Sequence, residues 1–244
     1  MPNTRSRSRI TPAWRGPFRH RNYRLFWFGQ LVSLAGTWMQ SIAQAWYITE
    51  LTTEPAWLGI VAAAQFTPVM VLGLFGGVLA DALPKHRALM GTQVSLMVLA
   101  MLQAVLVATG LMTLPLLILM AVLLGVVNAI DMPVRHSFFS EMVPEDEVGR
   151  AVAMNSAMFN GARVIGPAIG GVLISVIGVA GCFAVNGASF LATLLALLLM
   201  REVELHAAPR GARPRSVEAV KTSLMEGLRY VQRTPIVALC VFVI

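Results

Sequence analysis

The chain has 244 residues, of which 57% are hydrophobic and only 13% are charged. Soluble domains carry roughly 25% charged residues, so this composition, with a mean hydropathy of +0.70, excludes an ordinary water-soluble domain. Two cysteines are too few for a secreted disulfide scaffold. Six spans of about 20 residues each fit within this length, and we therefore expect an all-α membrane protein.

Apolar stretches separated by polar turns predict the spans in chain order. A basic tail, residues 1–24, precedes a first stretch that is too long for a cleaved signal sequence. The predicted spans are 25–49, 57–80, 89–109, 116–131, 151–177 and, after a tight turn at 178–181, a sixth that ends at 200. We expect residues 25–200 to form one six-span unit, followed by a cytoplasmic linker over 201–235. Residues 236–244 are apolar but would rise only about 14 Å as a helix, which predicts a truncated seventh span.

The basic residues are distributed unevenly, although the net charge of +7 taken alone would suit a nucleic-acid-binding protein. Lys and Arg occur in the tail, in the loops after the second and fourth spans and in the linker, whereas the three intervening turns contain none. Cytoplasmic loops carry the excess of Lys and Arg. We therefore expect a multi-pass protein of the cell membrane with a cytoplasmic N-terminus, and no nucleic-acid partner.

Polar side chains recur along one face of the first predicted span. Gln30, Ser33, Thr37, Gln40 and Gln44 follow each other at steps of three and four residues, which places them on one side of a helix. They either bond to neighbouring helices or line a wet cavity, and the repeated glutamines favour the cavity. Gln65 and Asn128 in the second and fourth spans are weaker candidates for the same cavity.

The fifth predicted span contains an arginine near the middle of the membrane. Ser156, Asn160, Arg163, Pro167 and Gly170 share one helical face. A charge at this depth costs a few kcal/mol or more, so such residues face a cavity or a partner. We predict that Arg163 and Asn160 line the transport cavity; the alternative is a structural ion pair, for which Asp131 is the available carboxylate.

Two further groups of charges lie at predicted cytoplasmic helix ends. Asp81, Lys85 and Arg87 follow the second span and can lock a helix end by charge pairing, or form a solvated positive loop. Asp131 and Arg135 are four residues apart and form a possible helix-end pair, although the intervening Pro133 disfavours regular helical spacing. We find no metalloprotease, nucleophile-elbow or P-loop motif, so we expect neither an enzyme nor a metal or organic cofactor.

Several motifs together resemble the major facilitator superfamily, in particular the drug:proton antiporter branch that includes enterobactin exporter-like and macrolide efflux proteins. The loop motif after the second span is matched at or beside Gly77, Asp81, Lys85 and Arg87, while Ala82 and Pro84 depart from it. The antiporter motif of the fifth span is matched by Ala162, Gly166, Pro167, Gly170 and Gly171, with alanine at 162 where glycine is usual.

This resemblance implies the six-helix N-terminal half of a twelve-span transporter, whose C-terminal half is missing from this chain. It implies export of small amphipathic organic molecules, of drug or siderophore type, across the lipid bilayer by alternating access driven by a proton gradient. A lipid or lysolipid translocator of the same fold and a non-transporting membrane scaffold remain as alternatives.

Overall fold

The computed structural model describes residues 16–205, and within this range the side chains of 74–82 and Glu202 are outside the description. The described residues form the α-helices α1 (Arg21–Leu51), α2 (Ala56–Ala82), α3 (Lys85–Ala108), α4 (Leu114–Glu141) and α5 (Val148–Leu198). Short 3-10 turns are η2 (Pro17–Arg19), η3 (Glu145–Glu147) and η4 (Glu202–Glu204). The first residues of the expected tail, most of the linker and the expected seventh span lie outside the described residues.

The fifth and sixth predicted spans are the two arms of α5, which reverses direction at Gly178. This glycine has φ 69° and ψ 177°, a left-handed conformation that costs glycine little because it has no Cβ. The turn predicted over 178–181 is therefore shorter than expected, since helical structure resumes at Val179. Gly110, with φ 70°, ends α3 in the same way.

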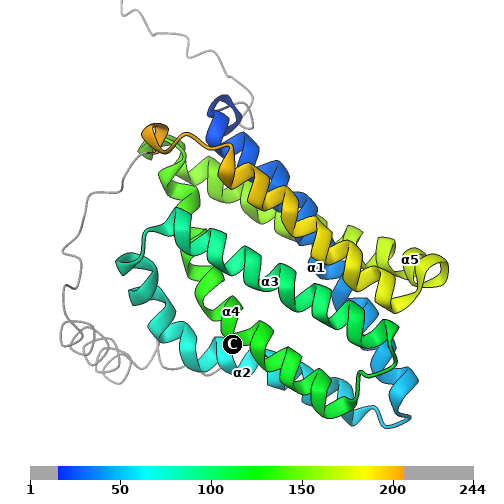
Figure 1. The fold of residues 1–244 in the computed structure, drawn as a ribbon. Helices are drawn as coiled ribbons and strands as arrows, with labels where there is room; N and C mark the ends of the chain where they lie inside the picture. Colours follow the sequence, from blue (N-terminus) through cyan, green and yellow to red (C-terminus); the bar gives the residue numbers. More distant parts are fainter. Residues whose placement is uncertain (1–15, 206–244) are drawn as a thin grey trace, which may run out of the picture.

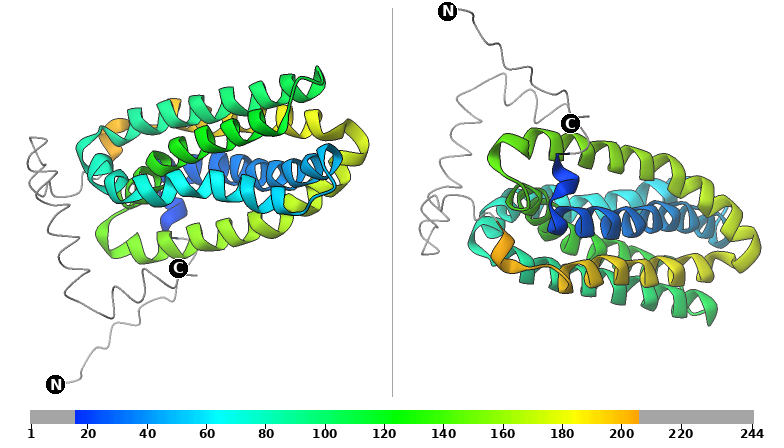
Figure 2. Two further views of the ribbon diagram at one scale, coloured as in Figure 1. Left: turned by 90° about the horizontal axis from the view of Figure 1, so that it is seen from below. Right: turned by 90° about the horizontal axis from the view of Figure 1, so that it is seen from above.

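The helices form one bundle in which α1 lies between the two arms of α5 (Figure 1; Figure 2, right). Gly29 and Gly36 of α1 approach the second arm at Ala192 and Ser189, and Gly166 of the first arm approaches Trp38 of α1. The helix α2 packs mainly on α4, while α3 lies between α4 and the second arm of α5. Small residues allow this close approach, as is typical of helices packed in a membrane.

The predicted end of the fourth span near Asp131 is wrong, because α4 continues through Pro133 to Glu141. An interior proline loses one backbone hydrogen bond and costs roughly 3 kcal/mol. The additional turns bury Val134, Phe138 and Phe139 almost completely, and each such side chain contributes about 1.5–3 kcal/mol. Phe138 and Phe139 pack edge-on against Phe26 of α1 at ring-centroid distances of 5.6 and 5.0 Å. The free energy gained by this burial outweighs the tendency of Pro133 to end the helix.

Four helical segments of the described part are long and apolar enough to cross a membrane: Ala56–Gly73, Lys85–Ala108, Leu114–Glu141 and Glu145–Leu198. The last comprises 54 residues and includes both arms of α5, so it supplies two of the predicted spans. The helix α1 has 31 residues and is long enough, but its polar side chains make it less apolar.

Candidate functional site

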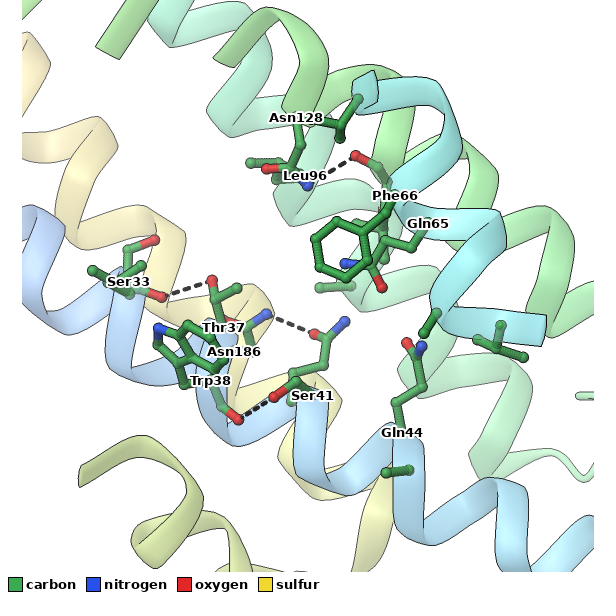
Figure 3. Close-up of a pocket in the computed structure, with 18 of the residues that line it drawn as sticks. Ser33, Thr37, Trp38, Ser41, Gln44, Gln65, Phe66, Leu96, Asn128 and Asn186 are labelled. Carbon is green, nitrogen blue, oxygen red and sulfur yellow. Dashed lines mark hydrogen bonds between the residues drawn. The ribbon is translucent and has the colours of Figure 1, made fainter. Parts of the chain in front are cut away.

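A cavity of about 390 Å³ lies between α1, α2 and α4, and the second arm of α5 closes its far side. Its apolar wall includes Phe66 of α2, Leu96 of α3 and Phe190 of α5. Figure 3 shows that its polar side chains come from several helices. They are Ser33, Thr37, Gln40, Ser41, Gln44, Gln65, Asn128, Arg135 and Asn186. The cavity is thus mainly apolar, with amides, hydroxyls and one guanidinium in its wall.

The structure brings four of the six predicted cavity residues together. Gln40 and Gln44 line the cavity from α1, Gln65 from α2 and Asn128 from α4. Asn160 and Arg163 are not in its lining and lie on an exposed face of α5. Asn160 donates to the carbonyl of Ser156 in its own helix at 2.8 Å. The polar face of α1 therefore forms one wall of the cavity, while the two predicted polar residues on the first arm of α5 lie outside it.

Gln40 is the centre of a buried amide network that connects three helices. Its Nε2 donates to Gln103 Oε1 of α3 at 2.8 Å, and its Oε1 accepts from Asn186 Nδ2 of α5 at 2.6 Å. Gln103 and Asn186 are 0% and 2% exposed. Neither residue was predicted from the sequence, although a single amide within an apolar span is itself a signal of an interhelical contact.

Most other polar groups of the cavity bond within their own helix. Thr37 Oγ1 donates to the Ser33 carbonyl at 3.0 Å, and Ser41 Oγ donates to the Trp38 carbonyl at 2.7 Å (Figure 3). Asn128 Nδ2 likewise donates to Leu124 at 2.9 Å. These side chains retain lone pairs or further donors, so the wall can accept and donate hydrogen bonds without losing its internal contacts.

Asp131 and Arg135 form an ion pair inside the bundle, and Arg135 also lines the cavity. The side chain of Asp131 is 0% exposed and that of Arg135 is 19% exposed. Asp131 Oδ1 accepts from Thr92 Oγ1 at 2.6 Å and from Gln93 Nε2 at 2.9 Å, both on α3. With its amide oxygen turned toward the guanidinium, Gln30 of α1 accepts from Arg135 Nε at 2.9 Å. The predicted pair therefore exists in the helix interior, and Pro133 does not prevent its i,i+4 spacing.

Arg163 contacts the cavity indirectly, through Trp38. Its guanidinium carbon lies 5.5 Å from the centre of the Trp38 ring, within the range of a cation–π contact. Phe159, one turn earlier on α5, packs edge-on against the same indole with centroids 5.7 Å apart. Trp38 and Phe159 both line the cavity. The ion pair between Arg163 and Asp131 that was the alternative does not form, since Asp131 pairs with Arg135.

The charged motif after α2 includes a side-chain contact between the start of α3 and the end of α4. Lys85 Nζ donates to Glu141 Oε1 at 2.7 Å and also to Ser137 Oγ. The neighbouring His86 ring contacts the carbonyl of Leu197 at 2.9 Å, while Arg87 is exposed. Gly77 and Asp81 belong to α2, but their side-chain positions fall outside the description. Lys85 thus pairs with α4, so this part of the motif ties two helix ends together.

The predicted motif of the fifth span forms the contact between α5 and α1. A Cβ on Gly166 would lie 2.5 Å from Trp38 Cβ and 2.8 Å from the Ala35 carbonyl oxygen, and one on Gly170 would lie 3.1 Å from the Met39 carbonyl oxygen. Ala162 is buried beside them. Gly171 instead borders open space, and Pro167 lies within the helix. Three of the five motif residues are therefore buried or packed against α1, and Gly171 lies on an outer face.

The described residues contain no group of three His, Cys, Asp or Glu side chains that could hold a metal ion. The cavity offers hydrogen-bonding groups, apolar contact and one ion pair. These features suit reversible binding of a small molecule within a membrane-embedded bundle.

Comparison with known proteins relates this bundle to transporters. Residues 11–243 match the family of the major facilitator superfamily described as transmembrane secretion effector. The multidrug efflux pump Tap of Mycolicibacterium fortuitum is 30% identical over 93% of this chain and 55% of its own length. The staphyloferrin A transporter of Staphylococcus aureus is 28% identical over 63% of this chain and 39% of its own.

The uncharacterized transporter YfiS of Bacillus subtilis is 27% identical over 85% of this chain and 48% of its own length. The chain spans about half the length of the curated relatives it matches. These relatives are membrane transporters and not enzymes, as the sequence predicts. The chain therefore belongs to the transmembrane secretion effector family of the major facilitator superfamily.

Proposed function

We propose that the cavity is the N-terminal part of a substrate path for export of small amphipathic organic molecules, driven by a proton gradient. The observation that carries this proposal is the composition of the cavity wall. Its apolar surface is interrupted by amides and hydroxyls from α1, α2, α4 and α5, which can orient a polar group of an otherwise apolar molecule. The names of two relatives, the multidrug efflux pump Tap and the staphyloferrin A transporter, support a small organic substrate.

The size of the cavity agrees with such a substrate. A volume of about 390 Å³ lies at the lower end of roughly 300–1,000 Å³ for ligand pockets. Phe66 borders the cavity and is 63% exposed, so the cavity opens beside α2. A second six-helix half placed over this opening would enclose the substrate, as transport by rocking of two halves requires.

Binding to the cavity is tested by the fluorescence of Trp38. In a variant whose other four tryptophans are phenylalanine, the chain is placed in nanodiscs and titrated with a macrolide and with a citrate-based siderophore. We expect saturable quenching by at least one of them, weakened by Gln40→Leu and Gln65→Leu. Thr67→Val is the matched control, because Thr67 is exposed on α2 and bonds to Ala63 of its own helix at 2.7 Å. Equal quenching in all variants would contradict the proposed site.

Proton coupling is tested by substrate-induced proton release. If substrate and proton compete, adding the quenching ligand to the solubilised chain in weak buffer releases protons in proportion to the occupied sites. Gln65→Leu, which weakens binding, shifts this release to higher ligand concentration. The measurement covers roughly pH 6–8, the range in which groups that exchange protons under physiological conditions titrate. Saturable ligand binding without proton release in this range would show that this chain does not carry the coupling site.

A further inference from the structure

Resting on the proposed function of the cavity, we propose that Arg135 binds an anionic oxygen group, a carboxylate or a phosphate, of the molecule that occupies it. Arg135 contributes a permanent positive charge to the cavity wall. The rest of the proposed contact surface is the adjacent apolar wall, formed by Met132 of α4, Leu96 of α3 and Phe190 of α5. The ligand class is therefore an amphipathic anion.

The guanidinium is fixed in a position from which it can still donate. Gln30 and Asp131 together accept from three of its N–H groups at most, and a guanidinium has five. Two donors remain for a further acceptor. The side chain of Arg135 is 19% exposed, whereas that of Asp131 is 0% exposed. The pair thus presents its positive member to the cavity and conceals its negative member in the protein.

The surroundings of Asp131 weaken its hold on the guanidinium. Thr92 and Gln93 both donate to its Oδ1, so the negative charge is shared among three donors on two helices. The contacts with Gln30, Thr92 and Gln93 join α4 to α1 and α3, but a pair that served only to join these helices would not need its guanidinium in the cavity wall. An arginine with spare donors next to apolar surface is instead suited to planar recognition of a carboxylate or phosphate.

The proposal makes two opposite predictions for the two members of the pair. Arg135→Gln removes the donor fork and the charge, and binding of an anion weakens by about tenfold or more. Asp131→Asn keeps the shape but removes the competing negative charge, so the same anion binds about threefold more tightly or better. Breaking a buried pair destabilises the protein, so a purely structural role predicts weaker binding in both variants.

The experiment measures binding of radiolabelled 1-naphthylacetate to the chain in phosphatidylcholine nanodiscs, by scintillation proximity. The uncharged 1-naphthylacetamide has nearly the same shape and serves as the matched ligand. Arg201→Gln is the matched variant, because Arg201 is a surface arginine with a side chain 67% exposed. We expect wild type and Arg201→Gln to prefer the acetate, Arg135→Gln to lose this preference and Asp131→Asn to increase it. Arg135→Lys, which keeps the charge without the fork, gives an intermediate value and serves if Arg135→Gln does not fold.

A second arm separates soluble anions from lipid headgroups. Nanodiscs containing phosphatidylglycerol are compared with phosphatidylcholine nanodiscs: loss of acetate binding only in the anionic lipid assigns the Arg135 site to a lipid phosphate, and unchanged binding assigns it to a soluble anion. Equal affinity for acetate and amide in wild type, unaltered in Arg135→Gln, would overturn the anion site while leaving the cavity function intact. If neither compound binds to any variant, the anion site fails, and the cavity function is judged separately by the quenching of Trp38.

Discussion

Asn22, at the start of α1, exchanges two hydrogen bonds with Arg201, just after α5. Its Nδ2 donates to the Arg201 carbonyl at 2.8 Å, and its Oδ1 accepts from the Arg201 backbone N–H at 3.1 Å. Asn22 is 2% exposed, so its amide is largely shielded from water. At the scale of one residue, this amide fixes the distance between the first and last described helices.

Removing this side chain tests its contribution to stability. We expect Asn22→Ala to lower the free energy of unfolding by about 1–3 kcal/mol, because two partly buried backbone groups of Arg201 lose their partner. Asn160→Ala is the control, since Asn160 is exposed and bonds within its own helix, and its effect is within about 0.5 kcal/mol. Unfolding in mixed micelles, followed by circular dichroism, measures both. Equal losses would show that the contact with Arg201 contributes nothing specific.

The Arg163 guanidinium covers the ring of Trp38 and shields it. We expect Arg163→Gln to increase the acrylamide quenching constant of a variant that keeps only Trp38, because the indole face is uncovered. The change in stability is small, about 0.5–1 kcal/mol, as for other cation–π contacts near a surface. Arg163→Lys retains most of the protection, and Arg201→Gln leaves quenching unchanged. A quenching constant that does not respond to Arg163→Gln would show that the contact does not persist in the membrane.

At the scale of helices, contacts between glycine and backbone determine how closely α5 approaches α1. Gly166→Ala places a methyl group 2.5 Å from Trp38 Cβ and 2.8 Å from the Ala35 carbonyl oxygen, and neither group can move without shifting α1. We expect a loss of about 1–3 kcal/mol in unfolding free energy, typical of overpacking. Gly171→Ala meets nothing within 4 Å and gains up to about 1 kcal/mol of helix propensity. Thermal denaturation in detergent compares the two variants, and a more stable Gly166→Ala would contradict this packing.

The order of the spans could be predicted because each helix must cross a bilayer of fixed thickness, which sets the length of its apolar stretch. The end of α4 could not, because the burial of Phe138 and Phe139 against Phe26 depends on another helix. The face shared by Asn160 and Arg163 follows from helical spacing alone. The spacing does not predict which neighbour this face contacts. In the structure Arg163 lies over the ring of Trp38 and does not line the cavity.

The same distinction explains which site residues the sequence revealed. Gln40 and Gln44 could be predicted because the polar residues of α1 repeat at helical spacing. Gln103 and Asn186 are single amides on separate helices, and only the packing of three helices brings them to Gln40. Arg135 was identified as part of a pair, but its position in the cavity wall depends on the extension of α4.

At the scale of the whole molecule, the ends of the bundle differ in charge. The helix ends near Arg21, Lys85 and Arg150 lie together at one end of the bundle. The connections at the opposite end, 52–55 and 109–113, contain no Lys or Arg. Because positive loops stay in the cytoplasm, we predict that the end that includes Lys85 is cytoplasmic, as is the N-terminus.

This orientation can be measured with single cysteines in a variant in which Cys182 and Cys240 are replaced by alanine. The exposed residues Glu54 and Thr113, replaced singly by cysteine, are expected to react with an impermeant maleimide added to intact cells. Arg87, which is exposed at the other end, is expected to react as cysteine only after the membrane is permeabilised. Permeabilised cells provide the control, because all three positions must then be labelled. Labelling of position 87 alone in intact cells would reverse the orientation, and it would assign the charge pair of Lys85 and Glu141 to the outer face of the membrane.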